Sequence, residues 1–363
     1  MPALALSLRL GPVVAIALLG LPGPAAGADP LQHGFGAEAV VVVTGGETTR
    51  VMLGSGRAEV VETDASFVAH DLAVSGGAWM VAGSRRGLDR RERLALLAGD
   101  AERQRELPTP PGQTGALRTM PVVFGGDRLL AGQPGGGVAW LEGNSPRVFA
   151  VWAAEWTGDG FEQPVVVSPP GAGTQTGLSG AELADGSWLL VWTAFDGSDD
   201  EVMWSVHTSE GWSEPLGVAG DSQGPDITPS VAATHDGAIL AWSRFDGVQY
   251  RLTLAAYRDG AWSGPFLADT PSGLYPGFVR GVATPILSYL EVSETAARRW
   301  VVSEIDVAGR RVVASAGVPS RQVERPVIVA VGADGVRFGW QSQAPGRAVT
   351  PSSVFRAWEP EPQ

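Results

Sequence analysis

One sequence pattern occurs twice between residues 185 and 269, with a spacing of about 50 residues. Each copy contains an Asp-Gly turn, an apolar run, an alternating run and a closing Trp-Ser-x-Pro segment. Trp192 and Trp242 are 50 residues apart, and so are Trp212 and Trp262. Equal offsets at separate landmarks indicate a repeated structural unit, so we expect the chain to fold as an array of similar modules.

Each copy predicts four short strands joined by tight turns, because Asp-Gly and Glu-Gly tolerate the positive φ of hairpin turns. Four antiparallel strands in about 50 residues are typical of one β-propeller blade. Proline at 215 and 265 fits the outermost strand, which needs no complete hydrogen-bond ladder. We expect Trp192, Trp242 and Trp340 to fill the space between neighbouring blades.

Weaker copies of the pattern occur at 76–113, 135–164, 285–309 and 334–358. The sequence therefore predicts an all-β, six-bladed propeller with four-stranded antiparallel blades. The runs between 39 and 62 match the repeat poorly, and the last copy ends before a fourth strand. We expect an N-terminal strand to complete that last blade and close the ring, since closure removes free edges. Seven blades are the alternative, if 39–62 form a blade of their own.

The first 28 residues have the pattern of a secretory signal peptide. Arg9 supplies the positive region, 13–21 the apolar region, and 26–28 an Ala-Gly-Ala cleavage site. We therefore expect residues 29–363 to form a single propeller domain. We expect this domain to be exported to the periplasm or the extracellular space, with no stable insertion in the membrane after cleavage.

Composition excludes several classes of function. The net charge of −13 argues against binding to nucleic acid or to an anionic membrane surface. The absence of cysteine excludes disulfides, thiolate metal sites and cysteine nucleophiles. The four histidines fall in different units without metal-ligand spacing, so the sequence predicts no zinc site.

The turns at 210–215 and 259–265, which read Asp/Glu-Gly followed by Trp-Ser-x-Pro, resemble those of sialidase-like, Asp-box (BNR-type) propellers. In that family an Asp-box of the form Ser-x-Asp-x-Gly-x-Thr-Trp joins the third and fourth strands of a blade. Here Asp259 and Trp262 are three residues apart rather than five, and no full box occurs. The resemblance would imply an arginine triad, a Tyr–Glu pair and an acidic residue, for which the sequence offers only four unmarked candidates: Arg244, Arg280, Arg299 and Glu291.

Propeller geometry places a ligand at the mouth of the central channel, on the face built by loops joining second to third strands and by loops joining successive blades. Those loops carry the candidate ligand-binding residues Arg244, Asp246, Asp226, Tyr275 and Asp196. This mixture suits a hydroxyl-rich ligand or a protein partner.

The same face carries an acidic loop whose side chains are candidate calcium ligands: Asp196, Asp199, Asp200 and Glu201. Oxygen ligands suit Ca²⁺, but the loop lacks the ordered positions of an EF-hand. An acidic turn that is simply solvated is the alternative, and no other cofactor is expected.

Three functional hypotheses follow. The first is an exported, non-catalytic propeller that binds a glycan or another protein, because no catalytic motif stands out. The second is a sialidase-like glycoside hydrolase, which requires paired carboxylates and clustered arginines at the channel mouth. The third is a structural scaffold in an envelope assembly.

Overall fold

The computed structural model describes the backbone of residues 31–33, 40–45, 48–53, 58–61 and 67–339, the last range with gaps. The gaps lie at 88, 90, 101–102, 114, 146–147, 169–172, 196, 220–223, 269–271, 283, 293–297, 309–310, 320–326 and 333–334. Side chains are described for 67–308, with the same gaps, and for residue 312.

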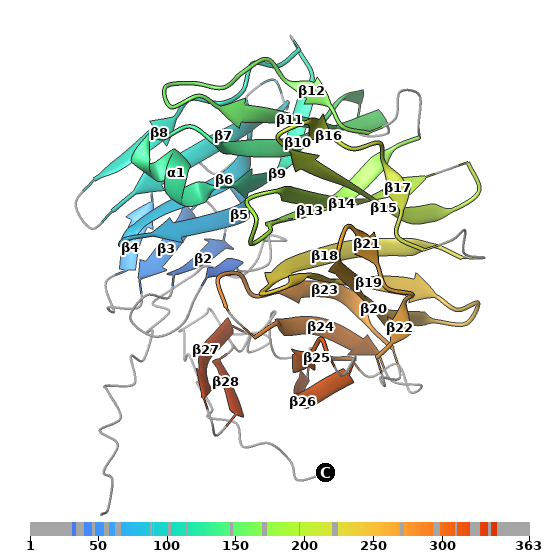
Figure 1. Cartoon of the computed structure of the whole chain (residues 1–363). Helices are drawn as coiled ribbons and strands as arrows, with labels where there is room; N and C mark the ends of the chain where they lie inside the picture. Colours follow the sequence, from blue (N-terminus) through green and yellow to red (C-terminus); the bar gives the residue numbers. More distant parts are fainter. Residues whose placement is uncertain are drawn as a thin grey trace, which may run out of the picture.

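Five antiparallel sheets follow one another along the chain, and we number them as blades 1 to 5 (Figure 1). Blade 1 contains β5 (Phe67–Ser75), β6 (Ala78–Arg86), β7 (Glu92–Gly99) and β8 (Gln104–Leu107). Blade 2 contains β9 (Leu117–Phe124), β10 (Gly136–Ser145), β11 (Val148–Trp156) and β12 (Val165–Val166). Blade 3 contains β13 (Gln175–Glu182), β14 (Trp188–Phe195), β15 (Asp200–Thr208), β16 (Gly211–Trp212) and β17 (Leu216–Gly217).

The last two blades repeat this order. Blade 4 contains β18 (Asp226–Thr234), β19 (Gly237–Phe245), β20 (Tyr250–Arg258), β21 (Ala261–Trp262) and β22 (Phe266–Leu267). Blade 5 contains β23 (Leu274–Phe278), β24 (Ile286–Val292), β25 (Arg298–Asp306) and β26 (Arg311–Pro319). Figure 1 shows the first strands of the blades turned toward the middle of the array, with the later strands further out.

The hydrophobic cores lie between blades rather than inside them. One aromatic side chain on the second strand of each of blades 2 to 5 is at most 1% exposed: Trp140, Trp192, Trp242 and Tyr289. Each packs in a cluster shared with the preceding blade. The expected filler role is therefore confirmed for Trp192 and Trp242, while Trp340 lies outside the described residues.

The prediction of an all-β propeller is confirmed, but the prediction of six blades, or of seven, is wrong. We count as blades the sheets that share a described core with a neighbouring sheet, and there are five. Within the copy expected at 334–358, the described residues form β28 (Gly335–Gly339), which pairs in a two-stranded hairpin with β27 (Val327–Gly332), and 340–358 lie outside the described residues. A weak repeat signal at the end of the chain, which already lacked a fourth strand, was thus counted as a sixth blade.

The expected closure by an N-terminal strand is also not found among the described strands. The strands β1 (Leu31–His33), β2 (Val40–Gly45), β3 (Thr48–Leu53) and β4 (Ala58–Val61) pair in chain order within a separate four-stranded sheet. Short Gly-rich connections favour this local hairpin pairing, since closing a short loop costs less chain entropy than closing a long one.

Proline lies on the outermost strand of blades 3 and 4, as the sequence predicts, and it also interrupts that strand. In blade 3, β16 and β17 both pair with β15, and Pro215 lies between them. Pro265 separates β21 from β22 in the same way. Among the described residues no helix is long and apolar enough to cross a membrane.

One short helix was not expected. It is α1 (Gly126–Ala131), which occupies the connection between β9 and β10. Gly125 and Gly132 flank it with left-handed φ values of 57° and 68°, conformations that glycine adopts without a steric penalty. Leu129 is 1% exposed and fixes the helix on the core between blades 1 and 2.

Candidate functional site

A pocket of about 480 Å³ lies where the first strands of blades 1 to 4 meet the segment that follows β23 in blade 5. The carboxyl-terminal halves of β5, β9, β13 and β18 and the segment after β23 line it. Each first strand is the edge of its sheet, so one side of its backbone has no partner strand. The walls therefore combine small apolar side chains such as Ala73 and Ala232 with main-chain polar groups.

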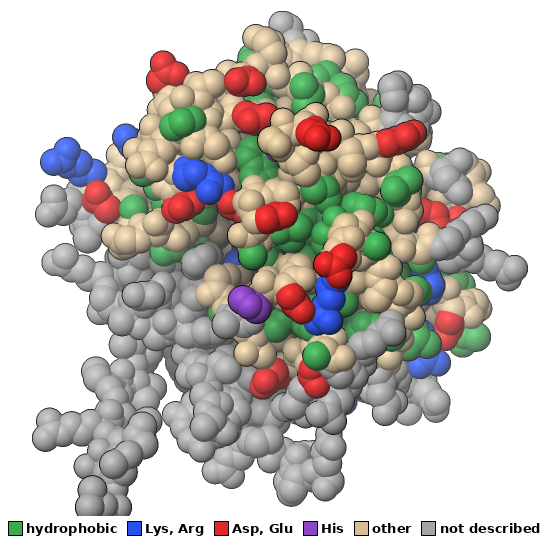
Figure 2. Space-filling model, in the orientation of Figure 1, with side chains coloured by type: hydrophobic (Ala, Val, Ile, Leu, Met, Phe, Trp, Pro, Cys, Tyr) green, Lys and Arg blue, Asp and Glu red, His purple; other side chains and the backbone are tan. Residues whose placement is uncertain are grey.

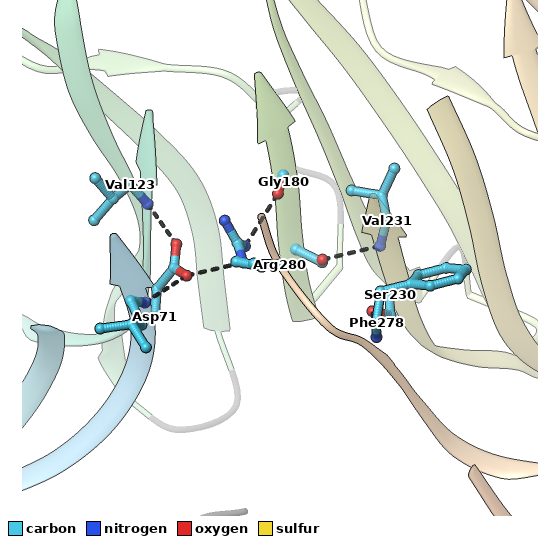
Figure 3. A network of polar contacts seen from close by, with 9 residues as sticks. Asp71, Val123, Gly180, Ser230, Val231, Phe278 and Arg280 are labelled. Atoms are coloured by element: carbon cyan, nitrogen blue, oxygen red, sulfur yellow. Dashed lines mark hydrogen bonds and ion pairs between the residues drawn. The ribbon is translucent and has the colours of Figure 1, made fainter. Parts of the chain in front are cut away.

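A buried ion pair closes one side of this pocket (Figure 3). Arg280 Nε lies 3.0 Å from Asp71 Oδ1, and the Arg280 Nη2 group donates a hydrogen bond to the carbonyl oxygen of Gly180 at 3.0 Å. Arg280 belongs to blade 5, Asp71 to blade 1 and Gly180 to blade 3. One arginine thus connects three blades across the pocket.

The Asp71 carboxylate is 2% exposed and has a full set of donors. Its Oδ2 accepts from the Val123 amide at 2.7 Å, and its Oδ1 accepts from the Leu72 amide at 2.7 Å. Burial raises the pKa of Asp71 above its ordinary value, while the charge of Arg280 and the two amides oppose that shift. The Arg280 guanidinium is 30% exposed, and the structure shows no acceptor for its Nη1 among the described residues, so Nη1 can bind a ligand.

The contact between Asp71 and Val123 belongs to a repeated series. Ser179 Oγ accepts from the Val231 amide at 3.2 Å, and Ser230 Oγ accepts from the Phe278 amide at 3.1 Å (Figure 3). In each case a side-chain oxygen on the first strand of one blade accepts an amide hydrogen from the first strand of a later blade. We call these three contacts the inter-blade clasps.

Acidic side chains border the pocket near α1. Glu182 is 28% exposed, forms an ion pair with Arg128 and accepts from the Gly125 amide at 2.7 Å. Asp127 lines the pocket and is exposed. Figure 2 shows acidic side chains spread over this face of the molecule, with basic ones at fewer places. The pocket therefore offers hydrogen-bond donors and acceptors but no strongly positive field.

The residues predicted from the sequence lie at the opposite end of the first strands. Asp226 begins β18, whereas the pocket is lined by Val231, Ala232 and Ala233 near the end of the same strand. Asp226 is 1% exposed, and the Arg244 Nη2 group donates to its Oδ2 at 2.6 Å. Burial raises the pKa of Asp226, and its hydrogen bond with Arg244 opposes the shift.

The other predicted residues divide into three cases. Tyr275 is 49% exposed and has a left-handed φ of 53° at a β-bulge of β23. Asp246 closes a turn by accepting from the amides of Val248 and Gln249, at 2.9 and 2.8 Å. Asp196 lies outside the described residues. The described residues contain no group of three or more His, Asp or Glu side chains placed to hold a metal ion, although Asp199, Asp200 and Glu201 are among them.

Asp246 allows a direct test of this part of the structure. Its hydrogen bonds with Arg251, Gln249 and Val248 lower its pKa to about 2. A depressed pKa favours the folded state above the ordinary pKa of 3.8, and this contribution is lost as the pH falls through about 2. An NMR titration of the carboxyl carbon should give a midpoint near 2, and Arg251→Ala should move it toward 3.8. An unchanged midpoint in that variant would contradict the assigned contact.

The arginine cluster implied by the sialidase resemblance is not assembled. Arg280 binds Asp71, Arg244 binds Asp226, and Arg299 binds Glu291 at 2.7 Å. Each guanidinium is thus held by a different carboxylate. The three arginines identified from the sequence therefore form three separate ion pairs and do not form one triad.

Sequence reasoning missed Asp71 and the clasps. Asp71 lies in a blade whose repeat signal is weak, and nothing in its local sequence distinguishes a buried clasp from a solvated carboxylate. Ser179 and Ser230 are 51 residues apart, close to the repeat spacing, and that offset was the available signal.

Comparison with solved structures supports the fold. A protein of unknown function from Dyadobacter fermentans DSM 18053 is similar with a TM-score of 0.51 and 13% identity, covering 77% of this chain and 92% of that protein. The fold is a β-propeller. An ulvan lyase of a new polysaccharide lyase family is similar over 89% of this chain and 91% of the lyase, at 10% identity, both with a bound saccharide (TM-score 0.56) and in a second structure (0.57).

No family model matches the sequence, and no curated protein matches it. The structural similarity supports the propeller fold alone, and the sialidase-like assignment has no support from these comparisons. The structural neighbours include a glycan-active enzyme and a protein of unknown function.

Proposed function

We propose that this protein is an exported, non-catalytic propeller that binds a glycan in its central pocket. The carrying observation is the pocket of about 480 Å³ that residues from all five blades line. That volume falls in the range of about 300–1,000 Å³ common for small-molecule sites. Strand edges, Arg280 and Asp127 supply the mixed donors and acceptors that a hydroxyl-rich ligand requires.

Charge favours an uncharged glycan over a polyanion. The chain has a net charge of −13, and Asp127 and Glu182 line the pocket. Arg280 is the arginine of the pocket lining, and it already shares its charge with Asp71. A polyanionic chain would therefore approach a negative surface without strong compensation.

The arrangement favours binding rather than hydrolysis. Glycoside hydrolysis ordinarily needs two carboxyl groups, one to transfer a proton and one to act as base or nucleophile. Of the two carboxylates in the pocket lining, Glu182 is held by Arg128 and the Gly125 amide. The other, Asp127, has no ion pair among the described residues.

The test is binding of the mature chain, from Asp29 onward, to an array of neutral and acidic oligosaccharides. We expect saturable binding of neutral glycans. Val282→Trp should abolish that binding, because Val282 is a half-buried pocket residue and the indole would occupy the ligand volume. Asp127→Asn should weaken it by roughly tenfold, the usual effect of losing a hydrogen bond to a charged group.

Glu162→Gln is the matched control for the Asp127 variant, since Glu162 is an exposed acid on blade 2 outside the pocket lining. It should bind like the unaltered protein. A folded protein with no glycan bound, or glycan binding that survives Val282→Trp, would refute the proposal and favour a protein partner.

A further inference from the structure

A second, smaller pocket lies in blade 4, apart from the central one. Its volume is about 210 Å³, and seven residues line it: Arg244, Asp246, Arg251, Thr253, Pro265, Phe266 and Leu267. At about 30 Å³ per water molecule, this space corresponds to roughly seven waters. It can hold one small ligand rather than a polymer chain.

Thr253 is the unusual residue of this pocket. It is 1% exposed, and its Oγ1 atom has no hydrogen-bond partner. An unsatisfied buried hydroxyl costs about 1–3 kcal/mol, so such a group in a folded protein calls for an explanation. A ligand that accepts or donates a hydrogen bond at Oγ1 would supply the missing partner.

The repeat shows that fold alone does not require threonine here. Thr253 pairs with the core residue Trp242 across strands two and three. The residue in the same relation to the core aromatic is Trp152 in blade 2, Met203 in blade 3 and Val301 in blade 5. Blade 4 alone among these four has a polar side chain at that position.

Blade 4 differs from blade 3 around the pocket as well. Arg244 is paired with the first residue of β18, whereas Ala194 holds that place relative to β13. Leu267 pairs with Thr253, whereas Gly217 pairs with Met203. Blade 4 thus has the shorter Thr253 where blade 3 has Met203. It also adds the Arg244 guanidinium and the Leu267 side chain around that position. These three differences leave a pocket in blade 4 at the position that methionine fills in blade 3.

The chemistry of the lining defines the ligand. Two arginines line the pocket, and each is paired with one carboxylate, Arg251 with Asp246 and Arg244 with the buried Asp226, so these four groups together carry no net charge. Asp246 is occupied by two amides and Arg251, while Arg244 bonds Asp226 through Nε and Nη2 and has no acceptor on Nη1 among the described residues. Pro265 and Leu267 form the apolar side, whereas the Phe266 side chain packs on the core shared with blade 5. Arg244 Nη1 and Thr253 Oγ1 can therefore both donate a hydrogen bond to a ligand in this pocket.

We propose that this pocket binds a small monocarboxylate with a short apolar body. Its carboxylate would accept from Arg244 Nη1 and Thr253 Oγ1, and its hydrocarbon part would pack on Pro265 and Leu267. Arginine suits this role because its planar guanidinium presents several donors to a carboxylate at once. The site shares no lining residue with the central pocket and does not rest on the glycan binding proposed for that pocket.

Hexanoate is the probe, and isothermal titration measures its binding to the mature chain. We expect one hexanoate per chain and no binding of hexylamine, which has the same apolar body and the opposite charge. Thr253→Val, which keeps the shape and removes the hydroxyl, should weaken hexanoate binding roughly tenfold. Thr253→Met, which introduces the residue of blade 3, should eliminate it by filling the pocket.

Thr193→Val is the matched control. Thr193 is 2% exposed on β14, and its Oγ1 also has no partner, but it does not line this pocket. It should bind hexanoate like the unaltered protein. Neither valine variant should have a lower thermal midpoint than the unaltered chain, because each loses only an unsatisfied hydroxyl. Absence of hexanoate binding, equal binding of hexylamine, or unchanged affinity in Thr253→Val would each overturn the proposal.

Discussion

Replacing Arg280 with alanine is expected to destabilise the folded chain by about 3 kcal/mol. Removing one partner of a buried ion pair typically costs about 3–5 kcal/mol, because the remaining charge stays buried without compensation. We expect the lower end, since the Arg280 side chain is 30% exposed and water can partly replace it. Urea unfolding followed by tryptophan fluorescence measures the difference.

The pH dependence identifies Asp71 as the cause. Without Arg280, the pKa of Asp71 should rise further above its ordinary value of 3.8. A raised folded-state pKa means that the folded state is penalised once the carboxyl ionises, and that protonation relieves the penalty. The deficit of Arg280→Ala should therefore be largest at neutral pH and shrink as the pH falls through the raised pKa. Arg258→Ala is the surface control, because its ion pair with Asp236 is 43% and 54% exposed. A deficit that does not depend on pH would contradict this account.

Replacing Trp192 with alanine should cost about 3–5 kcal/mol, the range for removing a large aromatic side chain from a packed core. Trp192 is fully buried between blades 2 and 3, and its indole Nε1 donates to Gln175 Oε1 at 2.6 Å. The substitution leaves a cavity and also leaves Gln175 Oε1 without its hydrogen-bond donor. The midpoint of urea unfolding should fall accordingly.

Two further variants separate the two parts of that cost. Trp192→Phe removes the indole N–H and keeps most of the volume, so it should cost about 1–3 kcal/mol through the unpaired Gln175 oxygen. Adding Gln175→Leu to Trp192→Phe should recover part of the loss by removing that oxygen. The free energy of unfolding lost in the double variant should be smaller than the sum of the losses in Trp192→Phe and Gln175→Leu. A loss that equals or exceeds that sum would show that the hydrogen bond does not have the role assigned to it.

The repeat made the strand architecture predictable, because the period is carried by residues whose physical role is strong. Tryptophans 50 residues apart fill equivalent spaces, and Pro215 and Pro265 fall on outer strands. The number of blades was not predictable in the same way. At the ends of the chain the repeat loses these marker residues, so counting apolar runs assigned six units where five blades are found.

The site was harder to predict than the fold for a related reason. Arg244 and Asp226 attract notice as charged residues near turns, yet their charges are mainly committed to each other. Asp71 and Arg280 are 209 residues apart and meet only because the Arg280 side chain reaches across the pocket from blade 5 to blade 1. Contacts of this kind depend on the arrangement of the blades around one pocket, and no local pattern encodes them.

The divided outer strands of blades 3 and 4 also bear on the behaviour of the molecule in concentrated solution. A long, regular sheet edge offers its free backbone groups to any other extended chain and so promotes aggregation. Here each outer segment is only two residues long and ends at a proline or near one. An incoming strand would find too few consecutive donors and acceptors to continue the sheet, so these flanks protect the protein from edge-to-edge polymerisation.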